Sequence, residues 1–268
     1  MSTVDMTPID MTVVHRILHI DPTWAAYAIA DLQPAFAPYC QWTLGQSGAE
    51  EGLILLFTAL NPPILVSIGP AAAVGDALAG AQLPDQIFIS AREEHYPALT
   101  EFYDFADRIQ AMWRMTPVDL SQATFPAFTR LVRLTVEDSE RMETLYHHGG
   151  EFAPDYFAPY QLRDGIYFGV ADEKAELVAA GGTHIVDHQA GIAAIGNIYT
   201  RPDQRNKGHA GAVFQAIVAT LQGENFTNIF LNVNQRNTAA RKLYERYGFK
   251  VYCPFIEGKG IKRLSYDG

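Results

Sequence analysis

A basic loop near residue 205 is the segment of this sequence best suited to bind a charged ligand. An apolar strand candidate ends near Thr200, and the loop after it carries Arg205, Lys207 and Gly208. The first N–H groups of a helix lack acceptors within the helix, and the helix dipole is positive at that end. A helix that starts near Gly208 therefore presents an anion site, and small residues such as Ala210 let a ligand approach the backbone. A plain strand-to-helix turn shares these features, so the loop alone indicates a phosphate site without deciding it.

A second helix candidate follows the loop and carries a tyrosine on its apolar side. Asn237 is a typical N-cap residue, and Gly248 is typical of the position just after a helix end. The inward stripe of this helix consists of Ala240, Leu243, Tyr244 and Tyr247. Because a buried tyrosine hydroxyl usually finds a polar partner, Tyr244 either completes the core or offers its hydroxyl to a ligand at the neighbouring loop.

Together, the two segments resemble the GNAT N-acetyltransferase superfamily. Arg205, Gly208 and Ala210 match its acyl-CoA pyrophosphate loop, Q/R-x-x-G-x-G/A. The second motif, N-x-x-A-x-x-L-Y-E-x-x-G-F, is matched by Asn237, Ala240, Leu243, Tyr244, Glu245, Gly248 and Phe249. The ordered pair at this spacing is far more specific than either motif alone. The resemblance covers roughly residues 125–256.

The resemblance implies a binding site for acetyl-CoA as a cosubstrate. In that reading the strand backbone of Ile198, Tyr199 and Thr200 pairs with the pantetheine arm. The amides that bind the pyrophosphate belong to Arg205, Asn206, Lys207, Gly208, His209, Ala210 and Gly211. Asn237 and Ala240 complete the set at the second helix. The hydroxyl of Tyr244 protonates the departing thiolate, because a donor at the sulfur stabilises the charge that develops there.

The group that accepts the proton of the attacking amine is less clearly indicated. An alkyl amine has a pKa of about 10, so it must lose a proton before or during attack. Many members of the superfamily place a glutamate on the strand before the loop, but Gly196 stands at that position here. His184, near the end of the neighbouring strand candidate, titrates in the useful range and is our predicted base. An ordinary surface histidine is an equally simple interpretation, and Glu151 and Tyr199 are weaker candidates.

No metal site is expected from the remaining histidines and cysteines. His147 and His148 are adjacent, so on a helix they point about 100° apart. His188 follows His184 at a spacing that suits a helical metal pair, but both lie in a strand and turn. The only two cysteines, Cys40 and Cys253, form no ligand cluster. With so few cysteines, we expect a reducing, cytoplasmic environment.

The strands and helices around these residues are predicted from local patterns. Strands are expected at 52–60, 64–68, 86–90, 130–135, 165–171, 176–185, 192–200, 228–233 and 249–255. Helices are expected from 71, around 93–105 and 136–147, and at 208–221 and 237–247. In the helix at 208–221, one apolar stripe consists of Ala210, Val213, Phe214, Ile217, Val218 and Leu221. Strands followed by alternating helices and strands predict a mixed α/β sheet.

Two domains are expected from the length of 268 residues. A proline-containing polar stretch at Met115–Phe128 marks the boundary, which gives a smaller α/β domain at 1–122 and a GNAT domain at 123–268. The strand–loop–helix–strand–helix order recurs in both halves, although the first copy lacks the basic loop. The first half is therefore either a degenerate GNAT-like copy or a coincidental use of a common arrangement.

Composition excludes several classes of protein. The chain is 48% hydrophobic, which is ordinary for a soluble protein with a real core. No segment approaches the roughly 20 apolar residues of a membrane helix, and the first residues carry acids where a signal peptide is basic. The net charge of −10 argues against a nucleic-acid binder.

The charge is unevenly distributed along the chain. Residues 201–250 carry eight Lys or Arg against three acids, whereas residues 1–200 carry nine against 25. An acidic first part favours a cationic acceptor. The expected function is transfer of an acetyl group from acetyl-CoA to the primary amine of a small molecule or amino-acid-like acceptor, by direct attack in a ternary complex. The alternatives are an amino-acid N-acyltransferase that uses longer acyl-CoAs and a non-catalytic acyl-CoA-binding module.

Overall fold

The computed structural model describes residues 9–118, 130–154 and 156–263. The chain divides into two compact units, which are Met1–Met112 together with Pro254–Gly268 (unit 1) and Trp113–Cys253 (unit 2). Unit 1 contains α1 (Met11–Leu18), α2 (Ala26–Ala30), β1 (Cys40–Ser47), β2 (Glu50–Phe57), β3 (Ile64–Ile68), α3 (Ala71–Gly80), β4 (Gln86–Arg92), α4 (Tyr96–Phe102) and β5 (Tyr103–Asp104). Unit 2 contains β7 (Leu131–Arg133), α5 (Ser139–Tyr146), α6 (Pro159–Asp164), β8 (Phe168–Ala171), β9 (Leu177–Asp187), β10 (Ile192–Thr200), α7 (His209–Gly223), β11 (Asn228–Asn234) and α8 (Thr238–Arg246).

Two long strands, β6 (Ile109–Pro117) and β12 (Phe249–Lys262), carry the chain from one unit to the other. In unit 1 the sheet order is β1-β2-β3-β4-β12, so its last strand comes from the C-terminal end of the chain. In unit 2 the order is β6-β11-β10-β9-β8-β7. Each unit is therefore completed by a strand that local sequence order would assign to the other half. The predicted border between residues 122 and 123 lies outside the described residues and stays a prediction.

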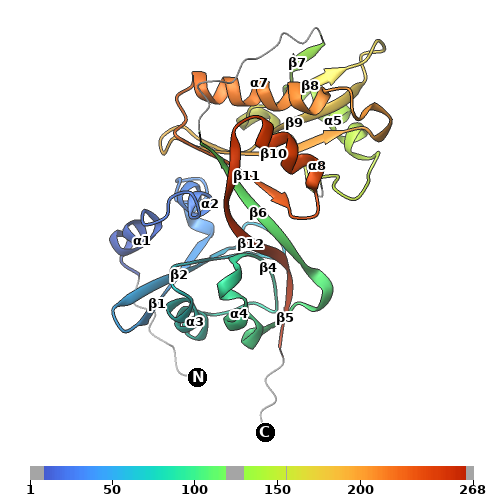
Figure 1. Cartoon of the computed structure of the whole chain (residues 1–268). Helices are drawn as coiled ribbons and strands as arrows, with labels where there is room; N and C mark the ends of the chain where they lie inside the picture. The colour runs from blue at the N-terminus through green and yellow to red at the C-terminus, as the bar shows by residue number, and fades with distance from the viewer. Residues whose placement is uncertain (1–8, 119–129, 155, 264–268) are drawn as a thin grey trace. The chain divides into compact units, whose positions relative to one another are not determined.

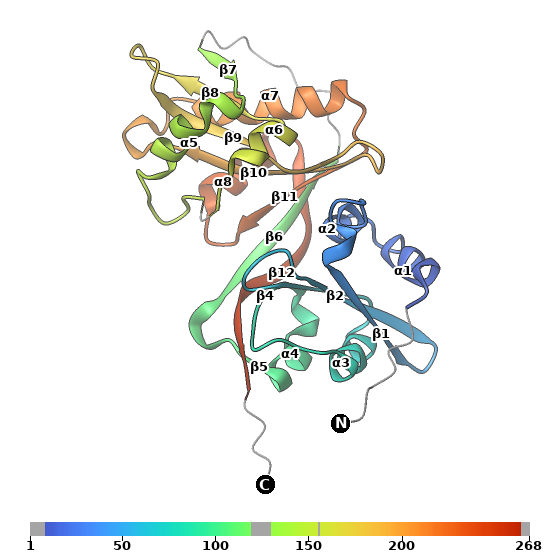
Figure 2. The same ribbon diagram turned by 180° about the vertical axis from the view of Figure 1, so that it is seen from behind.

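Unit 2 is a mixed sheet with helices on both faces. The pairs β7–β8, β8–β9 and β9–β10 are antiparallel, whereas β10–β11 is parallel. One apolar cluster joins the sheet to α7 and α8, and a second joins it to α5 and α6. Figure 1 shows α7 on the near side of this sheet, and Figure 2 shows α5 and α6 from the opposite side. The predicted mixed α/β fold is confirmed.

The predicted stripes of α7 and α8 do form the inner faces of these helices. In α7 the buried residues include Val213, Phe214, Ile217, Val218 and Leu221. In α8 Tyr244 is buried, and its neighbours Ala240, Leu243 and Tyr247 pack against the same cluster. Apolar burial at about 25 cal/mol per Å² thus fixes both helices on the sheet and orients their N-termini.

Unit 1 repeats the order of unit 2. Strands β1, β2 and β3 are antiparallel, and β3–β4 is a parallel pair joined by α3. In Figures 1 and 2, α3 and α4 lie on one side of this sheet and α1 and α2 on the other. The predicted recurrence of the strand–helix–strand–helix order in both halves is therefore present in the fold.

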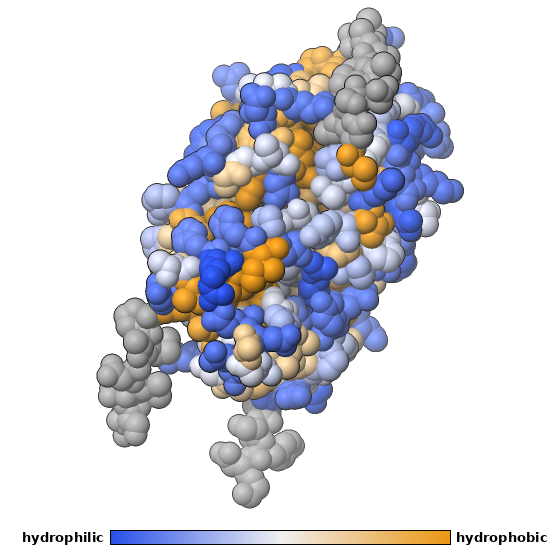
Figure 3. Space-filling model, turned by 60° about the vertical axis from the view of Figure 1, so that its left-hand side comes forward, coloured by the Kyte–Doolittle hydropathy of each residue, from blue (hydrophilic) through white to orange (hydrophobic). Residues whose placement is uncertain are grey.

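The surface is mostly polar where it can be seen. On the face drawn in Figure 3, hydrophobic residues reach the surface in several areas with hydrophilic residues between them. None of the helices in the described parts of the chain has the length and apolar character that crossing a bilayer requires.

Candidate functional site

The central strand β10 separates from its parallel neighbour halfway along. Pairing with β11 covers Ile192 to Ile195, and no pairing of the described residues continues it to the end of β10. On its other side β10 stays paired with β9, with a register shift between Gly196 and Tyr199. Asn197 lies in this shift with a φ of 54°, in the left-handed region. The bulge thus lets the second half of β10 leave the β11 edge while β9 still holds it.

The start of α7 follows directly from this open strand end. Gly208 is the N-cap residue with a φ of 84°, a conformation that glycine adopts without strain. The N–H groups of His209, Ala210 and Gly211 belong to the first turn, where no acceptor within the helix is available. The predicted helix start after a glycine turn is therefore present, whereas anion binding there stays a prediction.

The basic side chains of the loop are exposed beside this helix start. Arg205 donates from Nε to the carbonyl oxygen of Thr200 at 3.3 Å, and Lys207 donates from Nζ to Oε1 of Gln204 at 2.7 Å. Both partners lie in the loop or at the strand end, so the two charges stay close to the first turn of α7.

Two polar atoms at this place have no partner. Among the described residues, the buried side-chain atoms without a hydrogen bond are Oγ1 of Thr200 and Nδ1 of His209. Thr200 ends β10 and His209 opens α7. An unsatisfied buried polar atom costs about 1–3 kcal/mol, so the protein's own hydrogen bonding is incomplete at this junction.

Tyr244 lies in α8 against the middle of α7. Its ring centroid is 5.0 Å from that of Phe214, and 7% of the residue is exposed. Burial raises the pKa of its phenol well above the ordinary value. None of the hydrogen bonds between described residues involves its hydroxyl. One turn on, the hydroxyl of Tyr247 lies 2.7 Å from where a Cβ on Gly211 would stand, so α8 approaches the first turn of α7 closely.

The predicted base, His184, occupies the space that a side chain at position 196 would need. A Cβ on Gly196 would lie 2.3 Å from Nε2 of His184 and 2.5 Å from Cε1. The same Nε2 is 2.9 Å from Oδ1 of Asn197. Solvent reaches the residue, yet desolvation by surrounding protein lowers the pKa of His184, against a smaller raising effect of the bond to Asn197. The glycine that replaces the expected glutamate is thus the residue that makes room for the imidazole.

Asn197 was not among the predicted site residues. Its amide joins His184 to Gln161 and Tyr167, and its backbone carbonyl accepts a hydrogen bond from the hydroxyl of Tyr146 at 2.8 Å. A Gly-Asn pair inside a strand is the signal that indicates a bulge here.

Comparison with known protein families identifies the domain in unit 2. Residues 131–249 match the model of the acetyltransferase (GNAT) family. These residues form a GNAT acetyltransferase domain. Among curated proteins, none matches the chain.

Solved structures extend the likeness in fold beyond the GNAT domain. A Drosophila protein is 15% identical with a TM-score of 0.68, and the match covers 96% of this chain and 98% of that one. A GCN5-related N-acetyltransferase from Kribbella flavida is 17% identical with a TM-score of 0.58, over 90% and 96% of the two chains. A tandem GNAT protein from the clavulanic acid biosynthesis pathway is 12% identical with a TM-score of 0.56, over 89% of each chain. The resemblance in fold therefore includes the first half of the chain, as its element order predicts.

The weaker candidates of the GNAT domain are engaged elsewhere. Glu151 forms an ion pair with Arg236. The hydroxyl of Tyr199 donates to the carbonyl of Gly149 at 2.7 Å. His147 contacts the carbonyl of Glu143 through Nδ1, and no group of three or more metal-ligating side chains lies within the described residues.

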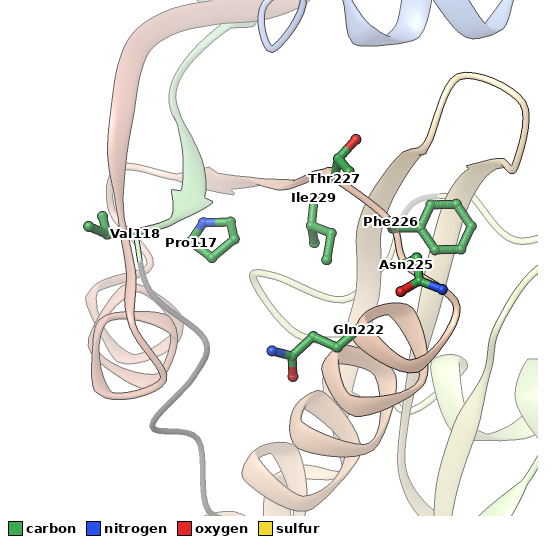
Figure 4. A pocket seen from close by; sticks show the side chains of 7 residues that line it. All are labelled: Pro117, Val118, Gln222, Asn225, Phe226, Thr227 and Ile229. Atoms are coloured by element: carbon green, nitrogen blue, oxygen red, sulfur yellow. The ribbon is translucent and has the colours of Figure 1, made fainter.

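A cavity of about 450 Å³ in unit 2 lies at the other end of α7. Figure 4 shows its lining, which comes from the end of β6, the last turn of α7 and the start of β11: Pro117, Val118, Gln222, Asn225, Phe226, Thr227 and Ile229. With 15 residues at about 1.5 Å each, α7 separates this cavity from Gly208 by about 20 Å. The cavity is therefore distinct from the candidate site at the helix start.

Proposed function

We propose that this protein is an N-acyltransferase that moves an acetyl group from acetyl-CoA to the primary amine of a small or amino-acid-like acceptor. The observation that carries the proposal is the junction of β10 and α7. There an open strand edge leads into an amide-rich helix start, and two buried polar atoms lack partners. The reaction requires a site for the donor, a group that stabilises the leaving thiolate and a base for the amine.

The junction supports the donor site in three ways. Beyond Ile195 the edge of β10 toward β11 is open to an extended pantetheine arm, because the parallel pairing ends there. The first turn of α7 offers its N–H groups to the pyrophosphate, with Arg205 and Lys207 beside it. The unpartnered polar atoms of Thr200 and His209 lie at the same junction; both are buried in this structure, so a local shift would bring them to the ligand. When bound, acetyl-CoA supplies an acyl group activated as a thioester.

Tyr244 is the proposed donor to the departing sulfur. Its raised pKa keeps the phenol protonated across the physiological range. A thiol of the cysteine type has a pKa of about 8.5, so the phenol is the weaker acid. It therefore stabilises the thiolate chiefly by donating a hydrogen bond, and a donor placed where charge develops lowers the barrier of the step.

His184 is the proposed general base. Its pKa lies below the ordinary value of 6.5, so the ring is neutral near pH 7 and has a free lone pair. As the amine nitrogen bonds to the acyl carbon and the carbon–sulfur bond breaks, the ring takes up the proton that the nitrogen loses. Asn237 holds the start of α8 in place, because its Oδ1 accepts from the amide of Ala240 at 3.1 Å.

The acceptor is proposed from charge alone. Residues 1–200 carry 25 acids against nine basic residues, which favours a cationic amine over an anionic acceptor.

The proposal also includes the domain division and the compartment. We propose two domains, at 1–122 and 123–268, and action in the cytoplasm. Both cysteines are free thiols, which fits a reducing compartment.

The test measures free CoA release with a panel of primary amines, with acetyl-CoA and longer acyl-CoAs as donors. We expect saturable release with acetyl-CoA and a cationic amine, with intersecting double-reciprocal plots that indicate a ternary complex. Faster turnover with longer acyl-CoAs identifies the amino-acid N-acyltransferase alternative. Tight acetyl-CoA binding by calorimetry without turnover on any amine identifies the non-catalytic module. Absence of any heat with CoA species refutes the donor site itself.

A further inference from the structure

A four-residue hydrogen-bond network continues inward from the His184 ring. Nδ2 of Asn197 lies 3.1 Å from the hydroxyl of Tyr167 and 3.5 Å from Oε1 of Gln161. Gln161 and Tyr167 are buried, with 5% and 0% of their surfaces exposed. The network therefore links an exposed ring to a fixed interior.

One backbone amide determines the orientation of both side-chain amides. The N–H of Ala158 donates to Oε1 of Gln161 at 3.1 Å as part of the cap of α6. A backbone N–H can only donate, so the atom that it meets on Gln161 is the oxygen. Asn197 must then present its NH₂ group to Gln161, because the flipped amide would set two oxygens against each other. Its Oδ1 is consequently the atom that faces His184.

An amide oxygen accepts hydrogen bonds and never donates them, so the 2.9 Å contact assigns a proton to Nε2 of the imidazole. In the neutral ring the lone pair then lies on Nδ1. We propose that Asn197 is a positioning residue that fixes His184 as the Nε2–H tautomer, so that Nδ1 is the nitrogen that takes the proton from the acceptor amine. The second part of this inference rests on the proposed function, whereas the tautomer does not.

The backbone at Asn197 supports this arrangement. Its φ of 54° suits asparagine better than most residues, and its carbonyl is held by the hydroxyl of Tyr146. The titratable groups that this network brings to the ring are the phenols of Tyr146 on α5 and Tyr167 before β8. Desolvation lowers the pKa of His184, and the hydrogen bond to Asn197 raises it by a smaller amount.

Two substitutions test the assignment, and a third serves as the control. Asn197→Asp keeps an acceptor at Nε2–H and adds a negative charge, so the His184 pKa should rise by about one unit or more. Asn197→Gly tolerates the positive φ but removes the acceptor, so the pKa should fall. Asn225→Gly is the matched control, because Asn225 also has a positive φ (61°) and lies at the far end of α7.

Two readouts separate the tautomer from the activity. Nitrogen-15 NMR of histidine-labelled full-length protein, with His184 assigned among the eight histidines by His184→Gln, reports which ring nitrogen carries the proton. The acidic limb of the plot of kcat/KM against pH should shift to higher pH in Asn197→Asp and to lower pH in Asn197→Gly. It should not shift in the control. A neutral ring protonated on Nδ1, or an unchanged His184 titration in both variants, overturns the inference. The expected NMR result in a protein without turnover leaves the tautomer standing and refutes only the proposed function.

Discussion

Gly196→Ala is the substitution that tests most directly whether the His184 ring lies where the proposed reaction needs it. The added Cβ would meet the ring at 2.3 Å from Nε2, 2.5 Å from Cε1 and 2.7 Å from Cδ2. Comfortable contacts between such atoms are about 3.5 Å, so the ring has to move by about 1 Å. A shift of about 1 Å directly away from Asn197 would lengthen the 2.9 Å contact between Nε2 and Oδ1 to about 3.9 Å, beyond hydrogen-bond range. Position 196 is not among the glycines with positive φ, so the backbone itself accepts alanine.

The expected loss follows from this displacement. A misplacement of 1 Å costs about 10²-fold, and removing a general base costs about 10²–10⁴-fold. We therefore expect kcat/KM for the amine to fall about 100-fold in Gly196→Ala, which corresponds to about 2.7 kcal/mol. The affinity for acetyl-CoA should change little, because the first turn of α7 is untouched.

The assay is a double-mutant cycle with His184→Ala. In that background the ring is gone, so the methyl group has nothing to displace and Gly196→Ala should have no further effect. The coupling energy should then approach the whole 2.7 kcal/mol, about the largest value seen for residues in contact. Gly223→Ala is the control, because a Cβ there meets no atom within 4 Å. Wild-type activity in Gly196→Ala, or losses that simply add in the double variant, would refute the role of His184.

Three further predictions concern the other parts of the site and the stability of the fold. If the Tyr244 hydroxyl acts on the leaving sulfur as proposed, Tyr244→Phe should lower kcat about 10–100-fold with less than about threefold change in acetyl-CoA affinity. Tyr103→Phe, at a buried tyrosine of unit 1, should leave kcat unchanged. Gly208→Ala strains the left-handed N-cap (φ 84°) by about 1–2 kcal/mol, so calorimetry should show CoA binding about 5–30-fold weaker. Burial lowers the pKa of His95, whose ring is held by Ser67 and the carbonyl of Gly69. As the pH falls below about 6.5, the unfolded chain therefore binds a proton that the folded chain does not. The free energy of unfolding should have its full value above about pH 6.5 and decrease below it. Urea unfolding at about pH 7.5 and about pH 5.5 should show this loss, and His95→Gln should reduce it.

The elements around the site were predictable from sequence because their signals are local. The bounds of β3 and β10 agree with the prediction, and α7 and α8 differ from it by one or two residues at their ends. Their apolar periodicity, the N-cap at Asn237 and the turn at Gly208 each depend on a few neighbouring residues.

The parts that the sequence did not reveal are set by distant contacts. Strand β1 reads CQWTLGQS, with only one buried residue, and β6 carries polar residues through its length, so neither shows a clear alternation. The predicted boundary at Met115–Phe128 begins inside β6, because no short-range sequence signal shows that a strand pairs with the sheet of the other unit. The exchange of β6 and β12 between the units likewise depends on pairing across the chain.

The bulge in β10 explains why two neighbouring residues act on the same ring. In a regular strand successive side chains point to opposite faces, so positions 196 and 197 could not both adjoin His184. The register shift and the left-handed backbone of Asn197 remove that restriction. Gly196 then leaves the space that the His184 imidazole fills, and Oδ1 of Asn197 accepts the hydrogen bond from Nε2 of that ring. The space and the hydrogen bond that β10 provides are fitted to a histidine from β9, which is why we propose His184 as the base although position 196 carries no glutamate.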